Sequence, residues 1–204
     1  MRIKPCGVRA WSPTSCYTRG MTALTRKRMS ANEFLAWAVQ RPEGERYELV
    51  AGEVIAMAPE RVSHVRVKAF VWLALREALN AGGIHCEALA AGTSLRIDDD
   101  TVYEPDALVR CGPPLHEDAI EVTEPIVVVE VVSPGTRARD SGVKLADYFR
   151  IASMRHYLIV KCDTRTVIHH RKDGDRIETR IVHGGSLVID PPGITVEVER
   201  FFEA

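Results

Sequence analysis

IVVVEVV, residues 126–132, places a single carboxylate, Glu130, within an otherwise apolar run. Its β-branched composition, followed by Ser133-Pro134-Gly135, predicts a strand that is buried on at least one face. An ionised carboxylate buried there without a partner would destabilise the fold by on the order of several kcal/mol or more. Glu130 therefore requires a charged or polar partner.

The bulk composition sets limits on the class of protein. At 204 residues and 46% hydrophobic, the chain can bury one core, and it contains no apolar stretch that approaches a membrane span. The formal net charge of −1 does not favour a tight, sequence-independent nucleic-acid binder, although it leaves a local basic groove open.

The cysteines show no metal-binding or redox motif. They are scattered without a CxxC pair, at Cys6, Cys16, Cys86, Cys111 and Cys162. An odd count without close spacing favours free thiols over disulfides or a zinc site. We therefore expect a cytoplasmic protein whose cysteines are free.

The N-terminal segment differs in composition from the rest of the chain. The first 32 residues contain no Asp or Glu, whereas the remainder contains all 28. A transit peptide is one interpretation, but a disordered leader or a start codon placed too early, with Met21 or Met29 as the true start, is favoured. We expect residues 1–28 to be such a leader and residues 29–204 to form a single domain.

Capping and periodicity predict the order of elements. Helices are expected from Ser30 (a capping box with Glu33), over 60–81 and near 140–152. A hairpin is expected over 46–58, and further strands at 84–90, 93–97, 101–110, 124–133, 155–161, 165–171, 176–182, 187–189 and 194–200. This order predicts an α/β (α+β) fold, a mixed central β-sheet flanked by helices, in which 124–161 forms a βαβ crossover.

A second carboxylate can meet Glu130. Pro105 lacks an N–H and belongs at a strand start, an edge or a bulge, and Asp106 follows it directly. If 106–110 and 126–132 are neighbouring strands, Asp106 and Glu130 can point to one face. Two such carboxylates, completed by waters, are typical of a Mg²⁺ or Mn²⁺ site.

The helix that follows Glu130 supplies a cation. Asp140, Lys144 and Tyr148 are spaced four apart and lie on one helical face. Because this helix directly follows the Glu130 strand, Lys144 can fold back beside the carboxylates. An ammonium group there can orient a water or stabilise charge that develops on a phosphate.

Several motifs together resemble a known family. In order they are YELVAGEV, His64, EPDALVR, VVVEVVSPGT, RDSGVKLADYFR and RHYLIVK. The series resembles the Uma-type (Uma two) restriction endonucleases of the PD-(D/E)xK nuclease superfamily, from about Met29 to the C-terminus. The resemblance implies a four-stranded mixed core sheet flanked by helices, and divalent-metal-dependent cleavage of DNA.

The resemblance also implies roles for individual residues. Asp106 matches the motif Asp and Glu130 the (D/E), while Val132 stands where the motif lysine is expected. Lys144 fits the displaced lysine of this branch, and Glu48 corresponds to an additional acid that can join the metal shell. Near the C-terminus, Lys161 replaces an acid common in relatives, which we interpret as neutral.

Each site residue has a structural alternative. Glu130 could pair with Lys144 without a metal, although a buried ion pair is rarely a net stabiliser, so the metal is favoured. Asp106 could be a turn or cap residue, and Glu48 an exposed edge-strand carboxylate.

Three further residues are assigned supporting roles. Lys144 and Asp140 could form a solvated i,i+4 pair, but Asp140 is interpreted as a helix N-cap. Tyr148 is interpreted as a core residue whose hydroxyl is hydrogen-bonded. His64, beside an apolar stripe of Val62 and Val65, is interpreted as structural or as a substrate contact. His169 and His170 are adjacent on a strand, point to opposite faces and cannot both bind one metal.

The functional hypothesis is a cytosolic Mg²⁺-dependent endonuclease acting on DNA, and cleavage of both strands favours a symmetric homodimer. The alternatives are a catalytically silent nuclease-fold module that binds or regulates, and a metal-dependent hydrolase of a non-nucleic substrate. A basic face formed by Arg137, Arg139, Arg150 and Arg155 would favour the endonuclease.

Overall fold

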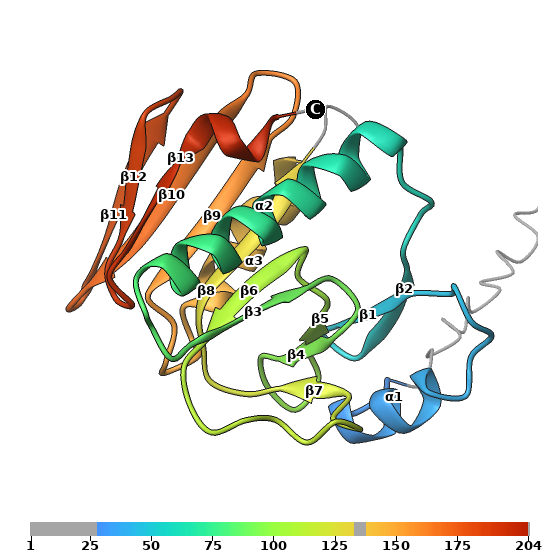
Figure 1. Cartoon of the computed structure of the whole chain (residues 1–204). Coiled ribbons are helices and arrows are strands. Elements are labelled where there is room, and N and C mark those ends of the chain that lie inside the picture. The colour runs from blue at the N-terminus through green and yellow to red at the C-terminus, as the bar shows by residue number, and fades with distance from the viewer. Residues whose placement is uncertain (1–27, 133–137, 204) are drawn as a thin grey trace, which may run out of the picture.

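The computed structural model describes residues 28–132 and 138–203 (Figure 1). The predicted leader therefore falls almost wholly outside the described residues. The helices are α1 (Ala31–Ala38), α2 (Val62–Ala81), α3 (Ala138–Tyr148) and the short 3₁₀ helix Val198–Phe201. The strands are β1 (Tyr47–Val50), β2 (Glu53–Ala56), β3 (Glu87–Ala90), β4 (Ser94–Arg96), β5 (Val102–Tyr103), β6 (Ala107–Arg110), β7 (Glu121–Val122), β8 (Pro125–Val132), β9 (His156–Lys161), β10 (Thr166–Asp173), β11 (Arg176–Val182), β12 (Ser186–Ile189) and β13 (Ile194–Glu197).

In the described part of the chain, the strands form two main sheets and a hairpin. The larger sheet has six strands in the order β11-β10-β9-β8-β6-β3, rather than the four implied by the resemblance. It is mixed, because β8 and β9 are parallel while the other neighbours are antiparallel. The smaller sheet has the order β2-β1-β5-β4-β7, and β12 pairs with β13. The predicted mixed α/β fold is confirmed.

Strand β8 lies in the middle of the larger sheet and is buried on both faces. Val127, Val129 and Val131 pack with α2 and the β12–β13 hairpin. Val128, on the other face, packs with Tyr148 of α3. Figure 1 shows α2 crossing the sheet on one side and α3 lying on the other. Glu130 falls on the α3 side, because alternate residues of a strand point to opposite faces.

Local sequence signals produce the expected elements. Ser30 and Glu33 form a capping box at α1. Ala51 and Gly52 turn the β1–β2 hairpin with φ values of 47° and 79°. The predicted crossover is present as β8, α3 and β9, with β8 and β9 parallel neighbours.

The predicted strand 101–110 is divided at Pro105. Its first part, β5, pairs with β1 and β4 in the smaller sheet, whereas β6 pairs with β3 and β8 in the larger one. Proline cannot donate to a ladder, so the chain leaves one sheet there and enters the other. This passage brings Asp106, directly before β6, to the junction of the two sheets.

The expectation that all cysteines are free was wrong. Cys86 and Cys111 form a disulfide with Cα atoms 4.3 Å apart, and Cys162 is the free thiol of the described residues. The register of β3 and β6 pairs Glu87 with Arg110, so the two cysteines stand opposite each other just beyond the ladder. Because Cys86 and Cys111 are paired, the cysteines no longer support the expectation of a reducing cytosol.

Reduction of this disulfide is expected to destabilise the fold. The bond joins residues separated by 25 positions, for which closure of the unfolded chain corresponds to about 3 kcal/mol. Denaturant unfolding of Cys86→Ser/Cys111→Ser should show this loss, with Cys162→Ser as the control. An unchanged free energy of unfolding would contradict the expectation.

Within the described ranges, no helix combines the length and the apolar character needed to cross a membrane.

Candidate active site

Glu130 finds its partners on α3. Its Oε1 atom accepts a hydrogen bond of 2.6 Å from the hydroxyl of Tyr148 and lies 3.0 Å from Nζ of Lys144. Tyr148 is fully buried, as expected for a core residue with a hydrogen-bonded hydroxyl. Burial, and then the negative charge of Glu130, raises the pKa of Tyr148 well above its ordinary value, so the hydroxyl remains a donor.

Lys144 connects Glu130 to a second carboxylate. Its Nζ lies 2.8 Å from Oε1 of Glu48, on β1 of the smaller sheet, and the backbone N–H of Glu104 donates to the same oxygen. Burial acts to lower the pKa of Lys144, but the charges of Glu130 and Glu48 outweigh it and leave that pKa above its ordinary value. The two carboxylates therefore favour the protonated form of Lys144.

Glu48 is half-buried, with 12% of its side chain exposed, rather than an exposed edge carboxylate. Desolvation raises its pKa, opposed by the charge of Lys144 and reinforced by that of Glu130. The two glutamates therefore repel each other across the ammonium group that joins them.

Asp106 directly precedes β6, the strand next to that of Glu130. Ala107, the first residue of β6, pairs with Val129, and the backbone N–H of Asp106 donates to the carbonyl of the same Val129. Asp106 is 4% exposed. Its Oδ2 accepts from the backbone N–H of Val131 at 2.6 Å, and its Oδ1 lies 2.6 Å from Nζ of Lys68 on α2. Burial, and then the charge of Glu130, raises the pKa of Asp106 to about 7, against the opposing charge of Lys68.

A polar face of α2, extended by Glu60 just before the helix, completes the surroundings of Asp106. Lys68 contacts Glu60 as well as Asp106, and His64 lies 3.3 Å from Glu60 through Nδ1. The Nε2 atom of His64 donates to the carbonyl of Val131, since a carbonyl can only accept. Asp106 and His64 thereby hold both backbone groups of Val131, the residue after Glu130.

Sequence reasoning missed Lys68 and Glu60, and it misjudged the first turns of α2. Val62 and Val65, expected to form an apolar stripe, are 68% and 52% exposed. The spacing of Glu60, His64 and Lys68 at intervals of four was the available signal, because such residues share one helical face.

Two further predictions concern Asp140 and the adjacent histidines. The side chain of Asp140, interpreted as a helix N-cap, lies outside the described residues. His169 and His170 contact His156 and Thr179 respectively and point to opposite faces of the sheet, as expected.

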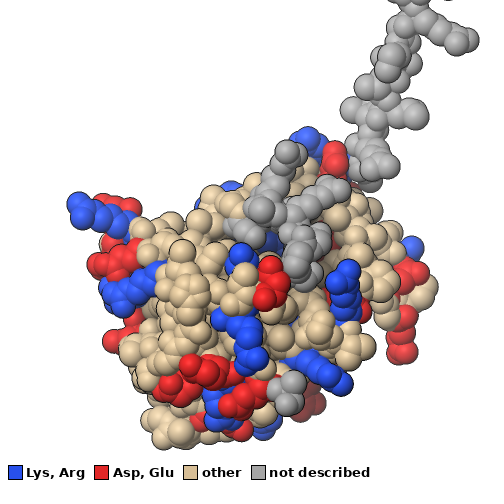
Figure 2. Space-filling view, turned by 90° about the horizontal axis from the view of Figure 1, so that it is seen from above, with Lys and Arg blue, Asp and Glu red and all other residues tan. Residues whose placement is uncertain are grey.

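A basic face formed by Arg137, Arg139, Arg150 and Arg155 is expected to favour the endonuclease over the alternative functions. Arg137 and the side chain of Arg139 lie outside the described residues. Arg150 is paired with Asp98 at 2.7 Å and with Asp147 at 3.5 Å. Arg155 donates to the carbonyls of Ala152 and Met154. Figure 2 likewise shows a face on which basic and acidic side chains are interspersed.

The atoms of this site that could bind a metal ion are carboxylate oxygens. Lys144 and Tyr148 both contact Oε1 of Glu130, and in the described part of the chain Oε2 has no partner. No group of three or more His, Cys, Asp or Glu among the described residues is arranged to hold a metal ion. Mg²⁺ often uses only one or two protein carboxylates and fills its shell with water and substrate phosphate. Asp106 and Glu130 are donors of this type, and their present lysine partners lie on α2 and α3, respectively.

Comparison with known families is consistent with the arrangement. Residues 31–201 match the model of the Uma2 family, described as "Putative restriction endonuclease". The chain belongs to this family. The resemblance seen in the sequence motifs is thereby confirmed, and the function is nuclease-like at the level at which the Uma2 family is described.

Similar proteins and structures support the same placement. Two uncharacterized proteins of Synechocystis sp. are 28% identical over 178 residues (86% of this chain, 92% of the relative) and 29% identical over 161 residues (76% and 88%). The crystal structure of "a putative nuclease belonging to DUF820" from Anabaena variabilis superposes with a TM-score of 0.67 at 16% identity. It covers 85% of this chain and 97% of that chain, which shows that the Uma2 protein shares its fold.

The raised pKa of Asp106 predicts a pH-dependent contribution to stability. The folded state binds this proton more tightly than the unfolded state, whose pKa is near 3.8. The contribution of Asp106 therefore favours folding most below about pH 4, and it is lost as the pH rises through about 7.

Asp106→Asn removes this titration and so isolates it. In EDTA, the free energy of unfolding of the wild type relative to Asp106→Asn should fall by about 3 kcal/mol between pH 5 and pH 8. Urea unfolding at both pH values measures the difference, with the exposed Asp118→Asn as the matched control. The same difference at pH 5 and pH 8 would show that Asp106 does not titrate in this range.

Proposed function

We propose that this Uma2 protein is a divalent-metal-dependent endonuclease that hydrolyses DNA phosphodiester bonds. The observation that carries the proposal is the cluster in which Lys144 contacts both Glu130 and Glu48, with Asp106 directly before β6, the strand next to that of Glu130. Family membership supports the reaction class, and these residues are where we expect the reaction to take place.

Asp106 and Glu130 would hold Mg²⁺ or Mn²⁺, with Glu48 as a further ligand. When bound, the ion would lower the pKa of a water and polarise the scissile phosphate. The residues of the chain have their own tasks. Lys144, kept protonated by two carboxylates, would stabilise negative charge on the phosphate or orient the attacking water. Tyr148 fixes the rotamer of Glu130 through its hydrogen bond.

Helix α2 would keep the carboxylates in register. Lys68 limits the repulsion between Asp106 and Glu130, and His64 anchors the backbone of Val131. Sites whose ligands are fixed by such surrounding contacts need little rearrangement when the substrate binds.

A second candidate is a catalytically silent nuclease-fold module that binds or regulates. The observation in its favour is that Glu130 and Asp106 each already have a lysine partner, so neither charge requires a metal.

The first candidate, an endonuclease, would need two active sites to cleave both strands of a duplex. We therefore expect a homodimer.

The test is cleavage of supercoiled plasmid by the purified protein in Mg²⁺, Mn²⁺ or EDTA, beside Lys144→Ala. We expect nicking in either metal, none in EDTA, and a rate at least about a hundredfold lower for Lys144→Ala. Lys172→Ala is the matched control, since Lys172 lies on β10 and contacts the carbonyl of Phe149.

The outcomes separate the candidates. Equal nicking by the wild type and Lys144→Ala would identify a contaminant or place the activity elsewhere. Absence of cleavage, together with plasmid binding in a gel-shift assay, would favour the silent module.

A further inference from the structure

Strand β11 is an unusually exposed edge of the larger sheet. It is seven residues long, stands at the end of the strand order and, among the described residues, pairs only with β10. Figure 1 shows it at the outer side of the sheet, away from α1. Six of its residues are exposed, including Ile177 at 44% and Ile181 at 63%. A long β-branched edge without proline is a template for pairing with another strand.

The register with β10 determines which backbone groups are free. Asp173 pairs with Arg176 across a two-residue turn, so this is a hydrogen-bonded pair, and the pairs alternate from there. The N–H and C=O groups of Ile177, Thr179 and Ile181 therefore point away from β10, toward the open edge.

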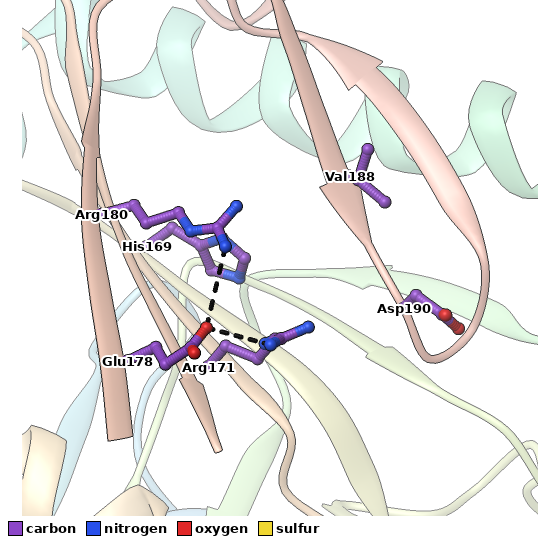
Figure 3. Close-up of a pocket in the computed structure, with 6 residues that line it drawn as sticks. All are labelled: His169, Arg171, Glu178, Arg180, Val188 and Asp190. Carbon is purple, nitrogen blue, oxygen red and sulfur yellow. Dashed lines mark hydrogen bonds and ion pairs between the residues drawn. The ribbon is translucent and has the colours of Figure 1, made fainter. Parts of the chain in front are cut away.

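The side chains of β11 divide between two faces. Glu178 and Arg180 extend on the same face as Arg171 of β10, and Glu178 lies 2.9 Å from Arg171 and 3.8 Å from Arg180 (Figure 3). Thr179 contacts His170 on the other face, which is the face of Ile177 and Ile181. One face of the edge is thus charged and the other is apolar.

The sequence of β11, RIETRIV, is self-complementary when reversed about Thr179. In an antiparallel pair of two copies, Thr179 would face Thr179, and Ile177 would face Ile181 on the apolar side. On the charged side, Glu178 would face Arg180 twice. In this register, the residues that hydrogen-bond across the interface are Ile177, Thr179 and Ile181, whose backbone N–H and C=O groups are free. Hydrogen bonding and side-chain pairing therefore require the same register.

Neighbouring registers are disfavoured. Moving the axis to residue 178 would place Glu178 opposite Glu178, and moving it to residue 180 would place Arg180 opposite Arg180. Like charges directly opposite each other destabilise a strand pair, whereas opposite charges stabilise it. The charges thus select the register that also overlaps all seven residues.

We propose that β11 is the homodimer interface and pairs with β11 of a second copy across a two-fold axis at Thr179. The two six-stranded sheets become one, and the axis, perpendicular to the sheet, leaves both α3 helices on the same face. The inference rests on the proposed function and deepens it, because a dimer would bring two active sites to one duplex. The association itself is measured without any cleavage.

Sedimentation velocity of the full chain tests the interface, with Glu178→Arg, Arg180→Glu and an equimolar mixture of the two. We expect a wild-type dimer at micromolar concentration, and a dissociation constant on the order of tenfold higher for each single variant, which meets like charges twice. The mixture should restore dimers, because the first variant carries arginine at both positions and the second carries glutamate at both. Each arginine of one chain then faces a glutamate of the other. Arg176→Glu is the control, since Arg176 would face Val182.

A monomeric wild type at about 100 μM, or single variants that dimerise as tightly as the wild type, would overturn the interface. Failure of the mixture to restore dimers would overturn the register. Hydrogen exchange of the wild type gives a measurement that needs no variant. The amides of Ile177, Thr179 and Ile181 should become protected as the protein concentration rises, and protection that does not change with concentration would reject the interface.

Discussion

Glu130→Gln should abolish metal-dependent plasmid cleavage, with a rate about a thousandfold below that of the wild type. Glutamine keeps the shape of the side chain and can still accept from Tyr148, which donates to Oε1 at 2.6 Å. It removes the negative charge that a divalent ion needs, and it leaves Lys144 paired with Glu48 alone. The loss would therefore reflect charge rather than misfolding.

The matched control for this variant is Glu53→Gln. Glu53 is exposed on the β1–β2 hairpin, so the same chemical change there should leave the cleavage rate unaltered. Circular dichroism and thermal unfolding would verify that both variants fold. Cleavage by Glu130→Gln at the wild-type rate would exclude Glu130 from the catalytic centre and leave its contacts with Lys144 and Tyr148 as structural ones.

Lys68→Met is expected to destabilise the fold by about 3 kcal/mol at pH 8. Lys68 is 9% exposed and neutralises both Asp106 and Glu60. Removal of one member of a buried charge cluster leaves its partners uncompensated, which typically destabilises a protein by about 3–5 kcal/mol. Protonation of Asp106 can relieve part of this at lower pH, since its pKa is already raised to about 7.

Thermal unfolding in EDTA measures this effect as a midpoint about 6–12 °C lower for Lys68→Met than for the wild type. Lys172→Met is the control for exchanging a lysine for methionine. A decrease in the free energy of unfolding below about 1 kcal/mol would show that the cluster relaxes without Lys68.

The local parts of the site could be predicted from the sequence. Glu130 stands out because its neighbours are β-branched. Lys144 lies in the same crossover, so the positions that its side chain can occupy relative to Glu130 are restricted. Lys144 does contact Glu130, as expected from that topology. The contact of Glu48 with the same lysine depended on the family resemblance, because 96 residues separate the two.

Other features had no sufficient local signal. The exposed Val62 and Val65 mimic the apolar face of an amphipathic helix, while the residues that turn inward, His64 and Lys68, are polar. Periodicity assigns the inner face of a helix by hydrophobicity, so it fails where a helix is packed against buried charges.

By itself the sequence determined the strand around Glu130, the crossover to α3, the β1–β2 hairpin and membership of the family, because each rests on short-range patterns. Only the tertiary structure decided that Cys86 pairs with Cys111, that Lys68 reaches Asp106 and that the chain changes sheets at Pro105. These features join residues that are distant in the sequence or belong to different sheets. Their proximity follows from strand order and register, which are set by the packing of the whole core rather than by any local segment.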